Sequence, residues 1–319
     1  MLTRIAALRS NEAACCNPAG PVPGRRGCVE TSEGDAMAGG DDGVECPVIP
    51  VERADDLHGM EEADRAGLIL FMAGNQFMAL PDLVEAFLRE NSGADPVAYE
   101  TLPPGLELAQ ILAGGARFGE RLLTGRPDVY TAVSWEAMQT LVQRDLIRED
   151  DLFVYLRNRL GIMVAAGNPK GIRGVRDLGR EDVRVSQPDP AGEHIAPFIE
   201  QMYRLAGGED LVRAVLRDKA DAGTTLWTTV HHRQTPQRIL EGEADAGPVW
   251  WTEIQRAGSL GLALEGIDPG PGLDRREAIA YYATGLRDCP NPEHASRFLE
   301  FLRSDAARDV FQRHGFLPV

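Results

Sequence analysis

The sequence predicts an α/β fold of two lobes, each a mostly parallel sheet flanked by helices. Short apolar runs alternate with amphipathic segments of about 10 to 15 residues, which is the pattern of strands separated by helices. The chain has 319 residues. That length exceeds one small core and suits two lobes of roughly 120 residues each.

The first predicted lobe covers residues 67–158 and the returning segment 277–319. It opens with a continuous apolar run at 68–73, as in a buried parallel strand. Ser134 is placed to cap a helix that runs to Gln143. The other elements expected in this lobe are a helix ending at Phe87, strands at 97–100, 127–132 and 277–282, and helices at 106–113 and 292–314.

The second predicted lobe covers residues 159–276. Its first strand is the apolar run at 160–166, which the turn Gly167-Asn168-Pro169 ends. A second buried run at 246–250 ends in two tryptophans. The remaining expected elements are a short helix at 175–178, a strand at 183–186 and helices at 195–205 and 236–241.

Residues 1–66 are predicted to be a disordered acidic tail. The segment is rich in Gly, Pro, Asp and Glu, holds 13 acids against 6 arginines and shows no sustained periodicity. Its cysteines do not follow a C-x-x-C metal pattern, so we expect thiols in a loose tail. These cysteines are Cys15, Cys16, Cys28 and Cys46.

Composition and motifs exclude several function classes. The net charge of −16 disfavours nucleic acid, which requires clustered cations. The sequence has no apolar run of about 18 residues that would predict a membrane span. It also lacks the GxSxG, Walker and HExxH motifs, so we do not expect an enzyme. The nearby carboxylates of Asp189 and Glu193 are ordinary for a loop and helix surface.

Six segments in this order resemble the solute-binding proteins of ABC importers, most closely the molybdate-binding type. They are LILFMAGNQFMALPDLVEAF, RPDVYTAVSWEAMQTLVQRDLI, RNRLGIMVAAGNPKGIRGVRDL, SQPDPAGEHIAPF, GEADAGPVWW and FLEFLRSDAARDVFQRHGF, within residues 67–316.

The resemblance implies a periplasmic binding protein-like fold, hinged around a central cleft that holds a small anionic solute without chemistry, cofactor or metal. Molybdate or tungstate is the expected solute, and the partner is an ABC transporter permease or a signalling protein. The family implies a periplasmic or extracytoplasmic location. The apolar core at 5–8 is too short for a signal peptide. A cytoplasmic or membrane-associated sensor or accessory protein on the same fold is therefore the alternative.

The sequence departs from the molybdate-binding pattern at three places. Asn75 and Gln76 stand where small hydroxyl residues are usual, and residues 101–105 replace a serine-rich loop. Trp250 or Trp251 stands where a tyrosine is expected. The identity of the solute is accordingly open.

Ligands of open α/β sheets bind at the carboxyl ends of strands, where helix N-termini attract anions. Each predicted contact also has a structural alternative: Asn75 and Gln76 as helix caps, His194 as a surface residue, and Trp250 as core. The segment His231-His232-Arg233 would be a solvated loop or would offer the Arg233 guanidinium to an oxyanion. The expected contacts are Asn75, Gln76, Ser134, Gly192, Glu193, His194, His231, His232, Arg233 and Trp250.

Two groups of residues have the composition of a metal site. Tyr281 and Tyr282 resemble the paired tyrosines of ferric-ion binders, but they lie in a plain strand. His231 and His232 with His194 and Glu193 would form a metal cluster, yet adjacent histidines on a helix or strand point apart. We therefore predict no metal site.

Overall fold

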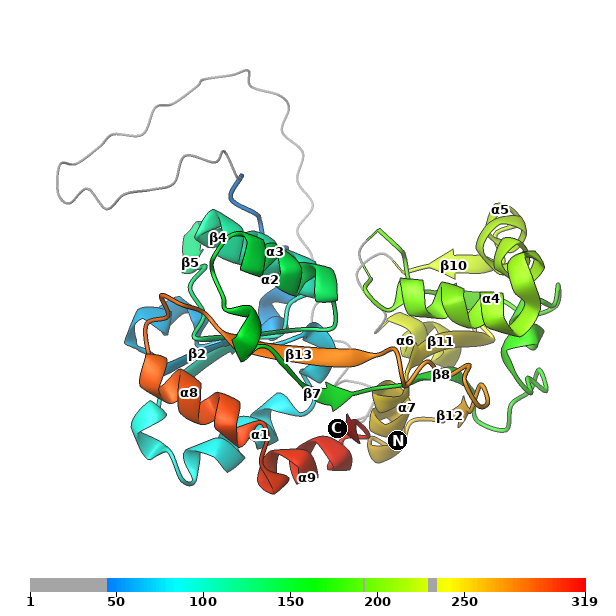
Figure 1. Ribbon diagram of the computed structural model, residues 1–319. Helices are drawn as coiled ribbons and strands as arrows, with labels where there is room; N and C mark the ends of the chain where they lie inside the picture. The colour runs from blue at the N-terminus through cyan, green and yellow to red at the C-terminus, as the bar shows by residue number, and fades with distance from the viewer. Residues whose placement is uncertain (1–44, 192, 229–233) are drawn as a thin grey trace, which may run out of the picture. The chain divides into compact units, whose positions relative to one another are not determined.

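The computed structural model describes residues 45–191, 193–228 and 234–319. Its first sheet has seven strands in the order β1-β3-β2-β6-β13-β7-β14 (Figure 1). In this sheet β2 is parallel to β3 and β6, whereas β13 and β7 are antiparallel to each other. The strands are β1 (Leu57–His58), β2 (Leu68–Phe71), β3 (Val97–Glu100), β6 (Val129–Ala132), β7 (Phe153–Arg157), β13 (Ala280–Gly285) and β14 (Leu317–Pro318).

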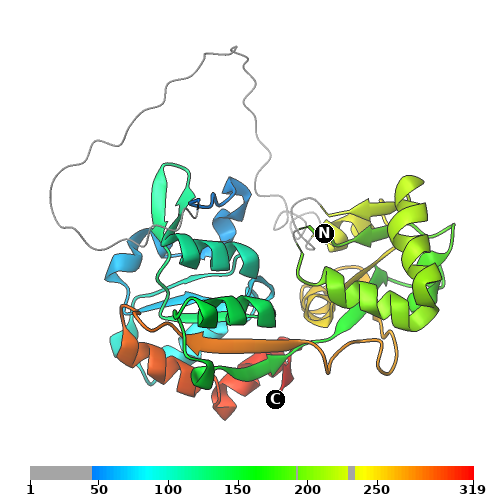
Figure 2. The same ribbon diagram turned by 45° about the horizontal axis from the view of Figure 1, so that its top comes forward.

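Both faces of the first sheet are buried, which explains the unbroken apolar run of β2. Successive side chains of a strand point to opposite faces, so Leu68 and Leu70 join one hydrophobic cluster while Ile69 and Phe71 join another. Two groups of helices cover these faces (Figures 1 and 2). The first group is α1 (Leu80–Leu88), α8 (Pro292–Phe301) and α9 (Asp305–Arg313), and the second is α2 (Pro104–Ala113) and α3 (Trp135–Gln143).

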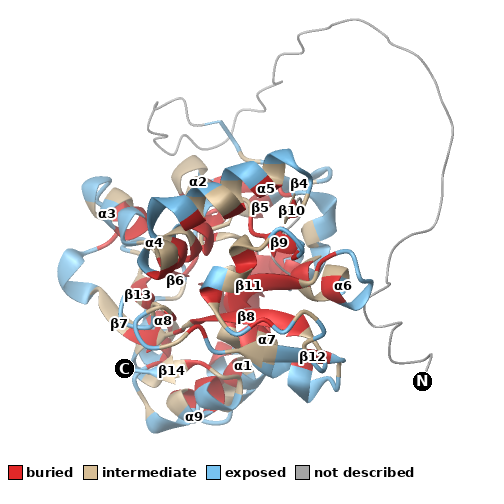
Figure 3. Cartoon of the chain, turned by 90° about the vertical axis from the view of Figure 1, so that its right-hand side faces the viewer, coloured by how far each residue is buried: buried red, intermediate tan, exposed pale blue. Residues whose placement is uncertain are grey.

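The second sheet has five strands in the order β10-β9-β11-β8-β12. Ile162 and Val164 of β8 pack toward α4, whereas Met163 packs on the opposite side toward α6 and α7. Figure 3 shows buried β8 and β11 beside α6 and α7. These elements are β8 (Leu160–Ala165), β9 (Val185–Gln187), β10 (Thr225–Trp227), β11 (Ala246–Trp250), β12 (Leu264–Ile267), α4 (Ala196–Arg213), α5 (Lys219–Asp221), α6 (Gln234–Leu240) and α7 (Trp251–Ser259).

The α/β class is confirmed, but both sheets are mixed rather than mostly parallel. Only β3-β2-β6 in the first sheet and β10-β9-β11 in the second are joined by parallel pairs. Four of the antiparallel strands lie where the chain passes between the sheets: β7 leads directly into β8, and β13 follows β12. The other two, β1 and β14, are the edge strands of the first sheet. Strand direction in a sheet depends on these crossings, which hydrophobic periodicity does not report.

The prediction of disorder up to residue 66 is wrong for residues 45–66. Ile49, Met60 and Ala63 of this segment are buried in the hydrophobic cluster beneath α2 and α3. The Thr101 amide also donates to the Asp56 carbonyl, with an N–O distance of 2.9 Å. Widely spaced apolar residues in short 3₁₀ turns supply this packing, so no helical or strand period marks it. Residues 1–44 lie outside the described part of the chain.

A two-stranded hairpin, β4 (Gly115–Phe118) with β5 (Arg121–Thr124), was not predicted. It is joined to the N-terminal segment by a bridge between Val48 and Arg117. Within the described ranges, every helix is too short or too polar to cross a membrane.

Candidate functional site

A pocket of about 500 Å³ lies where segments of both sheets meet. The loops that follow the parallel strands β3, β9 and β10 contribute to it, as expected for a ligand site in an open α/β sheet. The N-terminal segment adds two more residues. The lining residues are Pro50, Arg53, Pro103, Gly105, Leu106, Asp189, Pro190, Ala191, Glu193, His194, Pro197 and Thr228.

The loop after β9 is held in place by its own polar groups. Asp189 accepts a hydrogen bond from the Ala191 amide at 2.9 Å, and the Asp189 amide donates to the Thr228 hydroxyl at 3.1 Å. That hydroxyl donates to Glu193 at 3.4 Å. Thr228, directly after β10, therefore holds the backbone of Asp189 and the carboxylate of Glu193.

His194 connects the two sheets across this pocket. Its ring lies against the start of α2, because a Cβ atom built on Gly105 would be 3.4 Å from its Cε1. Burial lowers the pKa of His194, and the charges of Glu193 and Glu136 act in the opposite direction. The net lowering keeps the imidazole neutral at pH 7, so it adds no charge to the pocket.

Asn75 and Gln76 are buried and are hydrogen-bonded to tyrosines. The Asn75 side-chain amide donates to the Tyr281 hydroxyl. Gln76 Nε2 donates to the Tyr155 hydroxyl at 2.6 Å, and that hydroxyl lies 2.9 Å from Gln76 Oε1. Neither side chain caps a helix, so the capping alternative is wrong. Their role as ligand contacts stays a prediction.

The turn that carries these two amides packs tightly against the loop after β3. A Cβ atom on Gly74 would lie 2.9 Å from the carbonyl oxygens of both Thr101 and Leu102. This is closer than a side-chain carbon can approach a backbone oxygen. Glycine is therefore required where these two loops meet.

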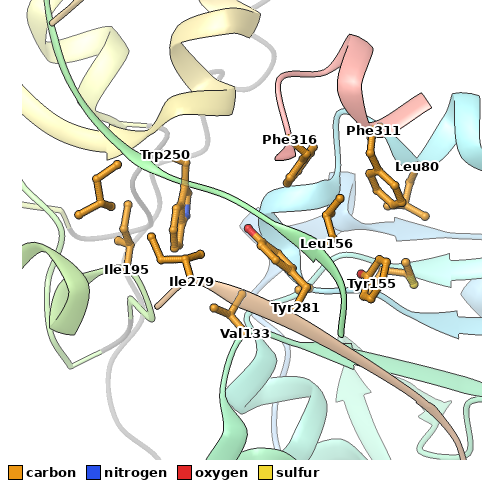
Figure 4. Close-up of a cluster of buried hydrophobic side chains, with 14 of the residues drawn as sticks. Leu80, Val133, Tyr155, Leu156, Ile195, Trp250, Ile279, Tyr281, Phe311 and Phe316 are labelled. Carbon is orange, nitrogen blue, oxygen red and sulfur yellow. The ribbon is translucent and has the colours of Figure 1, made fainter. Parts of the chain in front are cut away.

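Ser134 and Trp250 have structural partners. The Ser134 hydroxyl accepts from the Ala137 amide at 3.2 Å and thereby caps α3 as predicted. Trp250 is only 2% exposed and packs against Phe198 with a centroid separation of 6.2 Å. The burial of Trp250 therefore favours the alternative that it is a core residue (Figure 4).

Four predicted contacts lie outside the described residues. They are Gly192, His231, His232 and Arg233. The structure therefore brings together Glu193 and His194 from the predicted set, with Asn75, Gln76, Ser134 and Trp250 not among the residues that line the pocket.

Tyr281 and Tyr282 do not form a pair of the kind that binds ferric ion, because their side chains point to opposite faces of β13. Tyr281 is fully buried between Tyr155 and Phe316, as Figure 4 shows. Tyr282 lies against Trp135 with ring centroids 5.2 Å apart. Across the described ranges, no three His, Cys, Asp or Glu side chains are grouped in a way that could hold a metal ion.

Sequence reasoning missed several pocket residues. From the sequence Asp189 is expected to be an ordinary loop carboxylate, although its place shortly after the predicted strand at 183–186 could have identified it. No strand is predicted before Thr228, so its position at the end of β10 emerges only in the structure. Arg53 gave no such signal, because it lies in a segment with the composition of a disordered tail. It forms an ion pair with Asp56 at 3.3 Å.

Comparisons with known proteins agree on the fold. Residues 68–317 match the model of a family described as bacterial extracellular solute-binding protein. A search of curated proteins found no match.

Three solved structures illustrate the likeness. The periplasmic molybdate-binding protein of Azotobacter vinelandii is 16% identical with a TM-score of 0.63, covering 79% of this chain and 99% of that one. The sulfate-binding protein SubI from Mycobacterium tuberculosis is 16% identical with a TM-score of 0.62, covering 79% and 86%. Iron-bound HitA from Pseudomonas aeruginosa is 15% identical with a TM-score of 0.56, covering 79% and 85%. The predicted two-lobed, periplasmic binding protein-like fold is confirmed, whereas these ligands differ from one another.

Proposed function

Because the chain belongs to the bacterial extracellular solute-binding protein family, we propose that it captures a small oxyanion, such as molybdate or tungstate, in the pocket between its lobes. The bound solute is passed to an ABC transporter permease or is read by a signalling partner. The role is binding, with no bond made or broken in the solute.

The observation that carries this proposal is the meeting of two helix starts in one pocket. Pro103, Gly105 and Leu106 line it at the beginning of α2, and His194 and Pro197 line it at the beginning of α4. The first turn of a helix carries a partial positive charge of about half a unit. This charge, more than free amides, is what the two starts offer, because Pro104 and Pro197 have no N–H and the Leu106 and Ala196 amides donate to the Pro103 and Glu193 carbonyls. Two such ends from different lobes favour an anion, and its binding would draw the lobes together.

The carboxylates in the same pocket restrict where an anion would lie. Asp189 and Glu193 each repel negative charge, and the Arg53 guanidinium on the opposite side attracts it. An anion would therefore bind toward Arg53 and the start of α2, on the side of the pocket away from Asp189 and Glu193. The structural likeness to molybdate- and sulfate-binding proteins supports the same class of solute.

The proposal is tested by thermal unfolding of the full chain with molybdate, tungstate, sulfate, phosphate and a set of amino acids. A ligand that binds only the folded state adds about 2.7 kcal/mol of stability at a concentration one hundred times its Kd. We expect one oxyanion to raise the melting temperature in a concentration-dependent way. A rise with amino acids and none with any oxyanion would contradict the oxyanion assignment and favour a solute that uses both carboxylates.

A further inference from the structure

Two glutamates that do not line the pocket are buried inside the first lobe. Glu100 ends β3 and Glu107 lies on the first turns of α2, and both residues are 0% exposed. They lie where α2 packs on the sheet, beside the hydrophobic cluster that includes Leu102 and Ile111. Ionised carboxylates in such a place need donors or counter-charges.

The surroundings supply too few hydrogen-bond donors for ionised groups. Both oxygens of Glu107, Oε1 of Glu100 and Oε1 of Gln110 are buried without a hydrogen-bond partner among the described residues. Gln110 Nε2 donates to Glu100 at 3.3 Å and to the Thr124 carbonyl at 2.6 Å. Gln110, itself fully buried, thus has its donors engaged and its acceptor unused.

The neighbouring polar groups do not make up this deficit. The Tyr130 hydroxyl donates to the Pro104 carbonyl at 3.1 Å. Asp56 adds negative charge near both glutamates, and its carboxylate is engaged by Arg53 and by the Thr101 hydroxyl at 3.3 Å each.

His58 and Tyr155 are the other titratable groups that these acids influence. Asp56 acts on His58, whose pKa is lowered by its own burial. The charge of Glu107 contributes to raising the pKa of Tyr155, after burial. Neither side chain donates a hydrogen bond to either glutamate.

Burial raises the pKa of both Glu100 and Glu107 well above the usual carboxyl range. Mutual repulsion with Glu100 raises that of Glu107 further. The Leu102 backbone acts on Glu107 in the opposite direction without reaching hydrogen-bond geometry. The geometric shortage of donors and the electrostatics therefore favour the same protonation state.

We propose that Glu100 and Glu107 form a proton-binding site whose carboxyl hydrogens supply the missing donors, so that the stability of the first lobe depends on pH. A protonated carboxyl has one O–H to give, and Gln110 Oε1 and the facing carboxylate oxygens are the acceptors available to it. This device is independent of what the pocket binds.

The direction of the pH dependence follows from linkage. In the unfolded chain these groups release their protons near pH 4.3, whereas the folded protein retains them to higher pH. The stabilisation is fully present below the unfolded pKa and is lost as pH rises through the folded pKa. For each group that stays protonated only in the folded state, the unfolding equilibrium constant rises by about tenfold for every unit by which the pH is raised.

The experiment is urea unfolding of the full chain at a series of pH values from 5 to 9, for the wild type, Glu107→Gln and Glu100→Gln. Glutamine keeps an N–H donor at every pH. We therefore expect the unfolding equilibrium constant of each variant to rise with pH less steeply than that of the wild type, by up to tenfold per pH unit. Glu90→Gln, which removes an exposed carboxylate from the same lobe, is the matched control and should follow the wild type. Equal pH dependence in all four proteins would overturn the proposal.

Infrared spectroscopy of the wild type provides a second measurement that does not require a folded variant. Exposed carboxylic acids are ionised at pH 7, so a protonated carboxyl band at that pH reports buried acid. Its presence, and its decrease in whichever variant folds, would support the proposal. A wild-type spectrum with carboxylate bands alone would overturn it.

Discussion

Glu193 is the residue at which the charge of the pocket is most directly tested. It lines the pocket and its carboxylate accepts from Thr228, which a glutamine oxygen would also do. Glu193→Gln therefore removes one negative charge with little change in packing.

We expect Glu193→Gln to strengthen oxyanion binding by about 1 kcal/mol or more, or at least about fivefold in Kd, because two unit charges about 10 Å apart still interact with this strength at the effective dielectric constant of about 20 found near a protein surface. Calorimetric titration with the oxyanion that stabilises the wild type measures this change. Glu243→Gln, an exposed carboxylate of the second lobe, should leave the affinity unaltered. Weaker binding by Glu193→Gln would mean that the solute needs this carboxylate.

At the scale of elements, Asp128 joins three segments that are far apart in the sequence. Its carboxylate accepts from the Ile69 amide at 2.7 Å, from the Asn291 amide at 2.6 Å and from the Asn291 side chain at 3.0 Å. The same residue thus fixes the start of β6 to β2 and to the start of α8.

Asp128→Ala should lower the free energy of unfolding by about 3 kcal/mol, since each buried N–H left without an acceptor costs about 1 to 3 kcal/mol. Urea unfolding at pH 7 measures the loss. Asp288→Ala, at an exposed position close to the same helix start, should cost less than about 0.5 kcal/mol. Equal effects of the two substitutions would show that the Asp128 hydrogen bonds are not what holds these elements.

At the scale of the molecule, one hydrophobic cluster extends through both sheets. It contains Leu156 and Tyr281 from the first sheet, Leu160 and Trp250 from the second, and Ile279 from the connection between them (Figure 4). Side chains shared in this way couple the unfolding of the two lobes.

We expect the described lobes to melt in a single calorimetric transition, and Trp250→Ala to lower the free energy of unfolding by about 3 to 5 kcal/mol, as truncating a buried tryptophan does. The same substitution should broaden or split the transition. Trp135→Ala is the control, because Trp135 is 38% exposed and lies outside the shared cluster. Two separate transitions in the wild type would contradict the coupling.

Periodicity and capping are local properties, so the sequence alone was enough to predict the alternation of buried strands and helices and the Ser134 cap. It did not reveal the directions of β7 and β13, the packing of residues 45–66, or the engagement of Asn75 and Gln76 by tyrosines from strands more than 70 residues away. Those features appear only once the chain is folded. They depend on which distant segments share a face, and a hydrogen bond or buried contact between them leaves no periodic trace in either segment.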